Sequence, residues 1–237
     1  MSEFPLLHLV DAIYILNLAS RADRRAETLQ ELRLFGLDYE HPKVTLFQAI
    51  RPSSSNGFPN IGTKGCYLSH LSVLKDAHNH GHGCILILED DVTFTSQLSE
   101  ISSAQITEIE QSQWGIFNIG SLYQPDILHN FVTSAPSTAS FKDTHAILFK
   151  DSTITRLIPY LEAMLTRDQG DPLGGPMHVD GAYNWFRKDN PHIYTLVATP
   201  AMAVQRASKT DIHDTGWKEY IPFINIVRRL KNRLKIR

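Results

Sequence analysis

Three consecutive acids, Glu89, Asp90 and Asp91, offer the clearest chemistry in this chain of 237 residues. They directly follow the apolar run 84–88, which predicts a buried strand. Carboxylates held this close in a partly desolvated site repel one another, and a divalent cation relieves that repulsion. Mg²⁺ and Mn²⁺ prefer oxygen ligands, commonly carboxylates together with substrate phosphates. The acids therefore predict a metal centre for phosphate chemistry, and the alternative is a solvated acidic turn that caps a helix.

A second group of polar residues follows the first predicted strand, 13–18. Asn17 and Leu18 end this strand, and Arg24 and Arg25 come shortly after it. Ligands of open α/β sheets bind beyond the carboxyl ends of the strands, and arginine can hold a phosphate through two parallel hydrogen bonds. We therefore predict that these four residues contact a nucleotide donor. Because adjacent helical residues point about 100° apart, one of the two arginines is expected on a solvated helix face.

The sequence Gly-Cys-Tyr-Leu-Ser-His at 65–70, followed by Ile-Leu-Ile-Leu-Glu-Asp-Asp-Val at 85–92, resembles the paired signature of glycosyltransferase family 25. This family includes lipooligosaccharide and collagen galactosyltransferases. The opening strand with Arg24 and Arg25 is similar to the N-terminal signature of the family. Further segments follow in the expected order, so the resemblance extends from residue 12 to residue 214.

The resemblance implies a GT-A type fold, which is a Rossmann-like α/β sandwich. It also implies a UDP-sugar donor, usually UDP-galactose, a divalent cation, Mn²⁺ (or Mg²⁺), and inversion at the anomeric carbon. Ser69 and His70 of the signature are placed at the donor, with a core polar role bonded to the backbone as the alternative. Asp91 is implied as a metal ligand and Asp90 as a contact to the donor ribose or sugar. Glu89 has a longer side chain and is placed at the donor without a metal bond.

Two further site residues are predicted late in the chain. In GT-A enzymes a late histidine often completes the metal shell, and His213 is the matching candidate, with a surface histidine as the alternative. An inverting transfer needs a base that takes the proton of the acceptor hydroxyl. Asp180 follows the Gly- and Pro-rich loop 168–176 and is the candidate base, with a helix N-cap as the alternative. The loop itself is expected to close over the acceptor.

The elements that must position these residues alternate between strands and helices. Strands are predicted at 13–18, 44–49, 84–88, 114–119, 145–149 and 193–197. Helices are predicted from about 20 to 35 and at 65–80, 154–165 and 180–187. This alternation predicts an α/β fold with a mostly parallel central sheet. We expect residues 1–217 to form the GT-A-like domain and residues 218–237 to form a basic amphipathic C-terminal helix.

The charge of the chain is unevenly distributed. Six of the 23 basic residues lie at 228–237, where there is no acid, so the remainder has 17 basic against 25 acidic residues. An acidic body argues against nucleic acid as the partner. The basic tail suits an anionic membrane surface, or packs on the domain or on a second subunit. Because neither a secretory signal nor a membrane span is recognisable, we expect a cytoplasmic protein, or one peripheral to the inner face of the cell membrane.

The first functional hypothesis is a hexosyltransferase that moves galactose from a UDP donor to a glycan. The acceptor would be a glycan or lipid-linked saccharide, such as lipooligosaccharide or another surface polysaccharide. One alternative is a metal-dependent hydrolase of nucleotide-diphosphate sugars. The other is a non-catalytic module that binds a glycan or a membrane.

Overall fold

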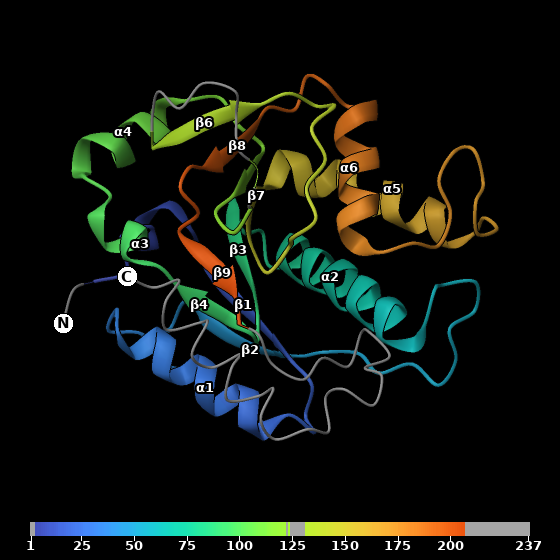
Figure 1. Cartoon of the computed structure of the whole chain (residues 1–237), viewed down its shortest axis with the longest axis horizontal. Coiled ribbons are helices and arrows are strands. Elements are labelled where there is room, and N and C mark those ends of the chain that lie inside the picture. Colours follow the sequence, from blue (N-terminus) through green and yellow to red (C-terminus); the bar gives the residue numbers. More distant parts are fainter. Residues whose placement is uncertain (1–2, 122, 124–130, 207–237) are drawn as a thin grey trace, which may run out of the picture.

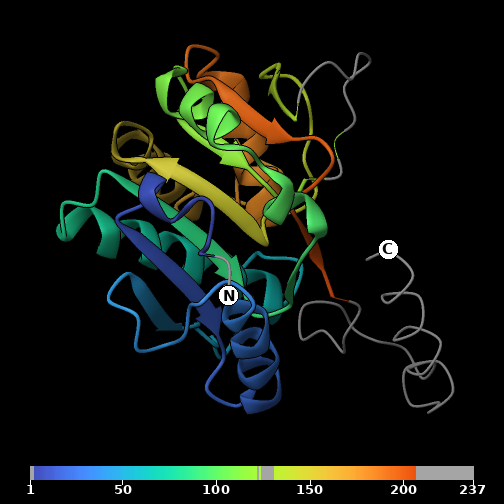
Figure 2. The same cartoon turned by 90° about the vertical axis from the view of Figure 1, so that its left-hand side faces the viewer.

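A seven-stranded sheet lies between two layers of helices in the computed structural model, which describes residues 3–121, 123 and 131–206 (Figures 1 and 2). The strand order is β2-β1-β3-β7-β5-β8-β6, and β4 and β9 form a separate two-stranded ribbon. The strands are β1 (Ala12–Asn17), β2 (Val44–Gln48), β3 (Cys84–Glu89), β4 (Val92–Phe94), β5 (Ile116–Asn118), β6 (Val132–Ala135), β7 (Ala146–Lys150), β8 (Thr195–Ala198) and β9 (Ala203–Gln205). The helices are α1 (Ala22–Arg33), α2 (Ile61–Asn79), α3 (Ser96–Glu100), α4 (Ser103–Gln111), α5 (Asp151–Leu165) and α6 (Val179–Asp189), after a 3₁₀ turn at Leu7–Leu9.

Most strands of the central sheet point the same way. The pairings give β2, β1, β3, β5 and β8 one direction, whereas β7 and β6 run antiparallel to their neighbours. The prediction of an α/β sandwich with a mostly parallel central sheet is confirmed. The predicted C-terminal helix at 218–237 lies outside the described residues.

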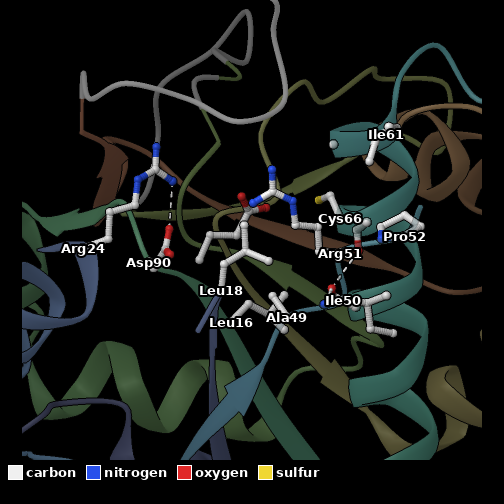
Figure 3. Close-up of a pocket in the computed structure, with 14 residues that line it drawn as sticks. Leu16, Leu18, Arg24, Ala49, Ile50, Arg51, Pro52, Ile61, Cys66 and Asp90 are labelled. Carbon is white, nitrogen blue, oxygen red and sulfur yellow. Dashed lines mark hydrogen bonds and ion pairs between the residues drawn. The ribbon is translucent and has the colours of Figure 1, made fainter. Parts of the chain in front are cut away.

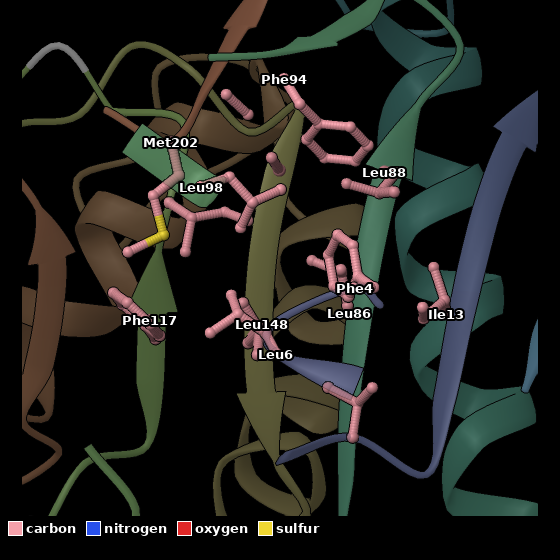
Figure 4. Packing of buried hydrophobic residues seen from close by; sticks show 14 of the residues in the cluster. Phe4, Leu6, Ile13, Leu86, Leu88, Phe94, Leu98, Phe117, Leu148 and Met202 are labelled. Atoms are coloured by element: carbon pink, nitrogen blue, oxygen red, sulfur yellow. The ribbon is translucent and has the colours of Figure 1, made fainter. Parts of the chain in front are cut away.

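Each face of the sheet carries its own hydrophobic core, because successive strand residues point to opposite faces. In β3, Leu86 and Leu88 pack with α1, α3 and the β4–β9 ribbon, and Figure 4 shows this cluster. Ile85 and Ile87 of the same strand pack with α2, α5 and α6. All four side chains are fully buried, and burial of one such side chain stabilises the fold by roughly 1.5–3 kcal/mol. The strand is therefore apolar from Cys84 to Leu88, and the acidic turn begins at its last residue, Glu89.

Several boundaries differ from the predictions. Helix α2 begins at Ile61, before its predicted start at residue 65, because the Asn60 side chain accepts a hydrogen bond from the Thr63 N–H at 2.7 Å and caps the helix. Helix α5 begins at Asp151 and continues through Pro159 to Leu165. The short elements α3, α4, β4, β6 and β9 were not predicted. Among the helices of the described residues, none has the length and apolarity to cross a membrane.

Candidate active site

The carboxyl ends of β1 and β3 lie side by side, since Leu16 pairs with Glu89 in the sheet. Nδ2 of Asn17 donates to Oδ2 of Asp90 at 2.7 Å, and Nη1 of Arg24 donates to Oδ1 of Asp90 at 2.8 Å. Thr28 donates its hydroxyl hydrogen to the Asp90 carbonyl oxygen at 2.8 Å. Asn17 and Arg24, both predicted to contact the nucleotide donor, thus hold the buried carboxylate of Asp90. Burial raises the pKa of Asp90, and the Arg24 charge opposes that rise.

Asp91 lies deeper and is less completely compensated. Its Oδ2 accepts a hydrogen bond from Nε2 of Gln205 at 3.1 Å and lies 3.3 Å from Nη1 of Arg24. Its Oδ1 is buried and has no hydrogen-bond partner among the described residues. Burial, with the charge of Glu89 adding to it, raises the pKa of Asp91 to about 7. Asp90 and Asp91 are 7% and 4% exposed, so the alternative of a solvated acidic turn is wrong.

Glu89 turns toward α2 rather than toward Arg24. Its Oε1 accepts the Thr144 hydroxyl at 2.9 Å and lies 3.3 Å from Nε2 of His70. The other ring nitrogen of His70, Nδ1, lies 3.0 Å from the Tyr183 hydroxyl oxygen. Although burial alone would raise the pKa of Glu89, the hydrogen bond and charge of His70 lower it below its usual value. The buried His70 is therefore a partner of the acidic turn, and the alternative of a backbone-bonded core histidine does not describe it.

A pocket of about 280 Å³ opens beside these acids. Figure 3 shows Arg24 and Asp90 at one end of the pocket, and Pro52, Ile61 and Cys66 at the other. The pocket is lined by Leu16, Leu18, Arg24, Ala49, Ile50, Arg51, Pro52, Ile61, Gly62, Gly65, Cys66, Ser69, Glu89 and Asp90. We call it the larger pocket, because it is the larger of the two pockets that Glu89 lines. Its mostly apolar wall and its charged end suit a molecule with a flat ring and an anionic group.

Helix α2 fixes the loop that forms one wall of the larger pocket. The Ile50 N–H donates to Oγ of Ser69 at 2.7 Å, and Ser69 in turn donates to the Gly65 carbonyl oxygen at 2.6 Å. A Cβ atom on Gly65 would lie 2.5 Å from the Ile50 carbonyl oxygen and 3.2 Å from Cδ of Pro52. Ser69, which was predicted to lie at the nucleotide donor, thus shapes the pocket through its hydrogen bond with the backbone of Ile50. Gly65 permits the backbone at Ile50 to approach α2 closely.

A second, smaller pocket of about 120 Å³ adjoins the first, since Cys66 and Glu89 line both. Asp180, the predicted base, lies in it, and burial raises the pKa of this carboxyl group. The N-cap of α6 is His178, so the alternative role of Asp180 as an N-cap is wrong. The smaller pocket is lined by Thr63, Cys66, Glu89, Lys142, Asp143, Thr144, His145, His178, Val179, Asp180 and Gln205.

Not every predicted residue reaches these pockets. Arg25 is half-buried and lines neither of them, and its backbone carbonyl accepts the Tyr39 hydroxyl at 2.7 Å. Asp91 and Asn17 also line neither pocket. Each contacts a residue that does, since Asn17 donates to Asp90 and Asp91 lies beside Arg24. His213 lies outside the described residues.

The sequence did not reveal the segment 142–145, which forms one wall of the smaller pocket. Strand β7 is antiparallel to β3, and Leu88 pairs with Ala146, so the start of β7 lies beside the end of β3. Thr144 and His145 therefore reach Glu89 from the opposite chain direction. His145 is buried, and burial lowers its pKa. The pair of polar residues directly before an apolar run was the available signal, but it does not fix the direction of the strand.

The fold and the acidic site agree with the protein family that the chain resembles. A family model described as "Glycosyltransferase family 25 (LPS biosynthesis protein)" matches residues 10–157, well over half of the chain. The matched length is enough to place the chain in the glycosyltransferase class of protein families. Within that class the chain belongs to glycosyltransferase family 25.

A curated relative and two solved structures are also similar to the chain. A "Glycosyltransferase 25 family member" of Anopheles gambiae is 32% identical over an alignment of 98 residues. The match covers 35% of this chain but only 17% of that protein. A crystal structure of a glycosyltransferase involved in glycosylation of the major capsid of PBCV-1 has a TM-score of 0.49 at 10% identity and covers 84% of this chain and 94% of its own. A structure of mannose-1-phosphate geranyltransferase from Thermus thermophilus has a TM-score of 0.38 at 12% identity, with 79% and 72% covered.

Proposed function

We propose that this chain transfers galactose from UDP-galactose to a hydroxyl group of a glycan, with Mn²⁺ or Mg²⁺ at Asp91. The acceptor would be lipooligosaccharide or another surface or lipid-linked saccharide. One observation carries the proposal: two adjoining pockets meet at Glu89, where the acidic turn leaves β3. A transferase needs two such compartments, one for the donor and one for the acceptor, whereas a hydrolase needs only room for water.

The larger pocket suits the donor. Ile50, Pro52 and Ile61 supply an apolar wall for the uracil ring, and Arg24 supplies a cation at the opposite end. Asp90 lies beside Arg24 and is held by Asn17, so its carboxylate is oriented before any ligand arrives. A carboxylate fixed in this way can accept hydrogen bonds from ribose or sugar hydroxyl groups at little entropic cost. Arg24 therefore both orients Asp90 and offsets the charge of a diphosphate.

The residues around Asp91 fit a divalent cation. Its Oδ1 is a buried carboxylate oxygen without a hydrogen-bond partner among the described residues. Burial, with the neighbouring charge of Glu89, raises the pKa of Asp91, so the ionised carboxylate is poorly compensated without a cation. Asp91 would hold the cation, together with oxygens of the donor diphosphate and His213. When bound, the cation supplies neutralisation of the charge that develops on the leaving diphosphate.

The smaller pocket suits the acceptor. Its walls are polar, with Lys142, Asp143 and His178 placed around Asp180. The Asp180 carboxylate would take the proton of the acceptor hydroxyl as the acceptor oxygen bonds to the anomeric carbon. The bond from that carbon to the diphosphate oxygen breaks at the same time, so UDP leaves and the configuration inverts. A raised pKa suits this base, because the carboxylate then binds a proton more strongly than an ordinary aspartate does.

The test compares UDP release from UDP-galactose with and without a panel of glycan acceptors, in Mn²⁺, in Mg²⁺ and in EDTA. We expect release that requires both a metal and an acceptor, and that falls about 10²–10⁴-fold in the Asp180→Asn variant. Glu108→Gln, on the exposed face of α4, is the matched control and should retain full activity. Equal release without any acceptor would indicate the hydrolase, and absence of metal-dependent UDP-galactose binding would reject the proposal.

A further inference from the structure

Cys66, His70 and Glu89 bring three different metal-ligating groups together at the boundary of the two pockets. One ligand atom of each residue lies within 4.8 Å of the others. Cys66 and His70 are four residues apart on α2 and so share one face of that helix. Glu89 faces them from the end of β3, with Oε1 at 3.3 Å from Nε2 of His70. This separation is close to that between two ligands of one tetrahedral ion.

The chemistry of this trio differs from that expected at Asp91. A thiolate, an imidazole and one carboxylate are ligands that zinc prefers, whereas Mg²⁺ and Mn²⁺ favour oxygen ligands. The groups around the trio would act as supporting hydrogen-bond partners. Nδ1 of His70 lies 3.0 Å from the Tyr183 hydroxyl oxygen, and the Thr144 hydroxyl donates to Glu89 at 2.9 Å. Such partners commonly orient the ligands of a metal site.

We propose that Cys66, His70 and Glu89 bind a zinc ion, separately from any cation at Asp91, and that this zinc inhibits the enzyme. The Cys66 thiol would lose its proton, and Nε2 of His70 would offer its lone pair while Nδ1 keeps the ring proton for Tyr183. Three protein ligands leave the fourth position of the ion to water or a ligand. Because Cys66 and Glu89 line both pockets, the ion would occupy the junction between donor and acceptor. The inhibitory part rests on the proposed function, whereas zinc binding itself does not.

Cobalt(II) tests the site directly, because a thiolate ligand gives a charge-transfer band in the near ultraviolet. The untagged chain of 237 residues, freed of metal, should show this band and saturate at one equivalent of Co²⁺. Cys66→Ser should remove the band, while Cys84→Ser, the matched control in the other cysteine, should retain it. Asp91→Asn should also retain it. Circular dichroism and the unfolding midpoint report whether each variant is folded.

Three results would overturn the zinc site: no band in the folded wild-type protein, a band that persists in Cys66→Ser, or a band lost in Cys84→Ser. Loss in Asp91→Asn would show one shared site instead of two. For the inhibitory part, zinc at ten times its Kd should weaken UDP-galactose binding by about tenfold through competition. In Cys66→Ser the ratio of affinities with and without zinc should be one. A band without this competition would leave zinc bound and reject inhibition, while failure of UDP-galactose binding altogether would count against the proposed function alone.

Discussion

Replacement of Asp91 by Asn should make the metal-free protein more stable at alkaline pH. Asn keeps the size of the side chain and can still accept from Gln205, but it removes the charge. The pKa of Asp91 is raised from 3.8 to about 7, so the folded state disfavours the ionised form. Stability of the wild type should therefore fall as pH rises from about 4 through 7, and the variant lacks this loss. At 1.36 kcal/mol for each pKa unit, the full effect is about 4 kcal/mol.

Urea unfolding in EDTA at pH 5.5 and at pH 8 measures this effect. The stability advantage of Asp91→Asn over the wild type should grow by about 2 kcal/mol between the two pH values, since the wild-type Asp91 ionises over this range. Glu108→Gln on α4 should show no pH-dependent difference from the wild type. Addition of Mn²⁺ at pH 8 should stabilise the wild type and not Asp91→Asn. An advantage that does not change with pH, or a variant less stable than wild type at pH 8, would refute a poorly compensated Asp91 carboxylate.

Three further predictions concern the base, the pocket wall and the tail. If Asp180 is the base, kcat/KM should rise with pH around a midpoint above the ordinary pKa range of aspartate, because burial raises the pKa of Asp180 and only the ionised carboxylate accepts a proton. Asp180→Asn should remove this rise of kcat/KM with pH, and an unchanged pH profile would exclude Asp180 as the base. Gly65→Ala should weaken UDP-galactose binding and destabilise the fold by about 1–3 kcal/mol, because the new Cβ would lie 2.5 Å from the Ile50 carbonyl oxygen. Binding calorimetry that showed wild-type affinity would contradict the assignment of this wall of the larger pocket to the donor. Deletion of residues 218–237 should reduce co-sedimentation with anionic vesicles and not with neutral ones, since each basic residue contributes roughly 1 kcal/mol near an anionic surface. Equal co-sedimentation of the deleted and the intact chain with anionic vesicles would reject the membrane role of the tail.

The main elements could be predicted because their hydrophobic patterns are strong. Strand β3 is apolar at five consecutive positions, and both of its faces are buried, so its pattern is that of a central strand. The short elements could not be predicted. Strands β4 and β9 have three residues each, and their pairing joins Val92 to Gln205 across more than a hundred residues. No local pattern indicates such a pairing, yet it brings Gln205 to the Asp91 carboxylate.

Strand direction limited what the sequence could say about the site. The parallel strands β1 and β3 end at the same edge, so the meeting of Asn17 with Asp90 follows from the rule for α/β sheets. Strand β7 reverses that rule, and the residues before it, including Thr144, reach the site instead of those after it. A single sequence gives the apolar run but not its direction. Of the residues that line the smaller pocket alone, the sequence therefore predicted only Asp180.

The signature at 65–70 combines two pairs of residues on one helix, each four residues apart. Gly65 and Ser69 face the loop at Ile50, where one permits close approach and the other accepts the backbone N–H. Cys66 and His70 lie one position further along, so they face a different direction, toward Glu89. The first pair builds the wall of the larger pocket, and the second lies at the junction with the smaller one. The spacing of the motif thus follows from the helical repeat, because one turn of α2 must serve two neighbouring surfaces.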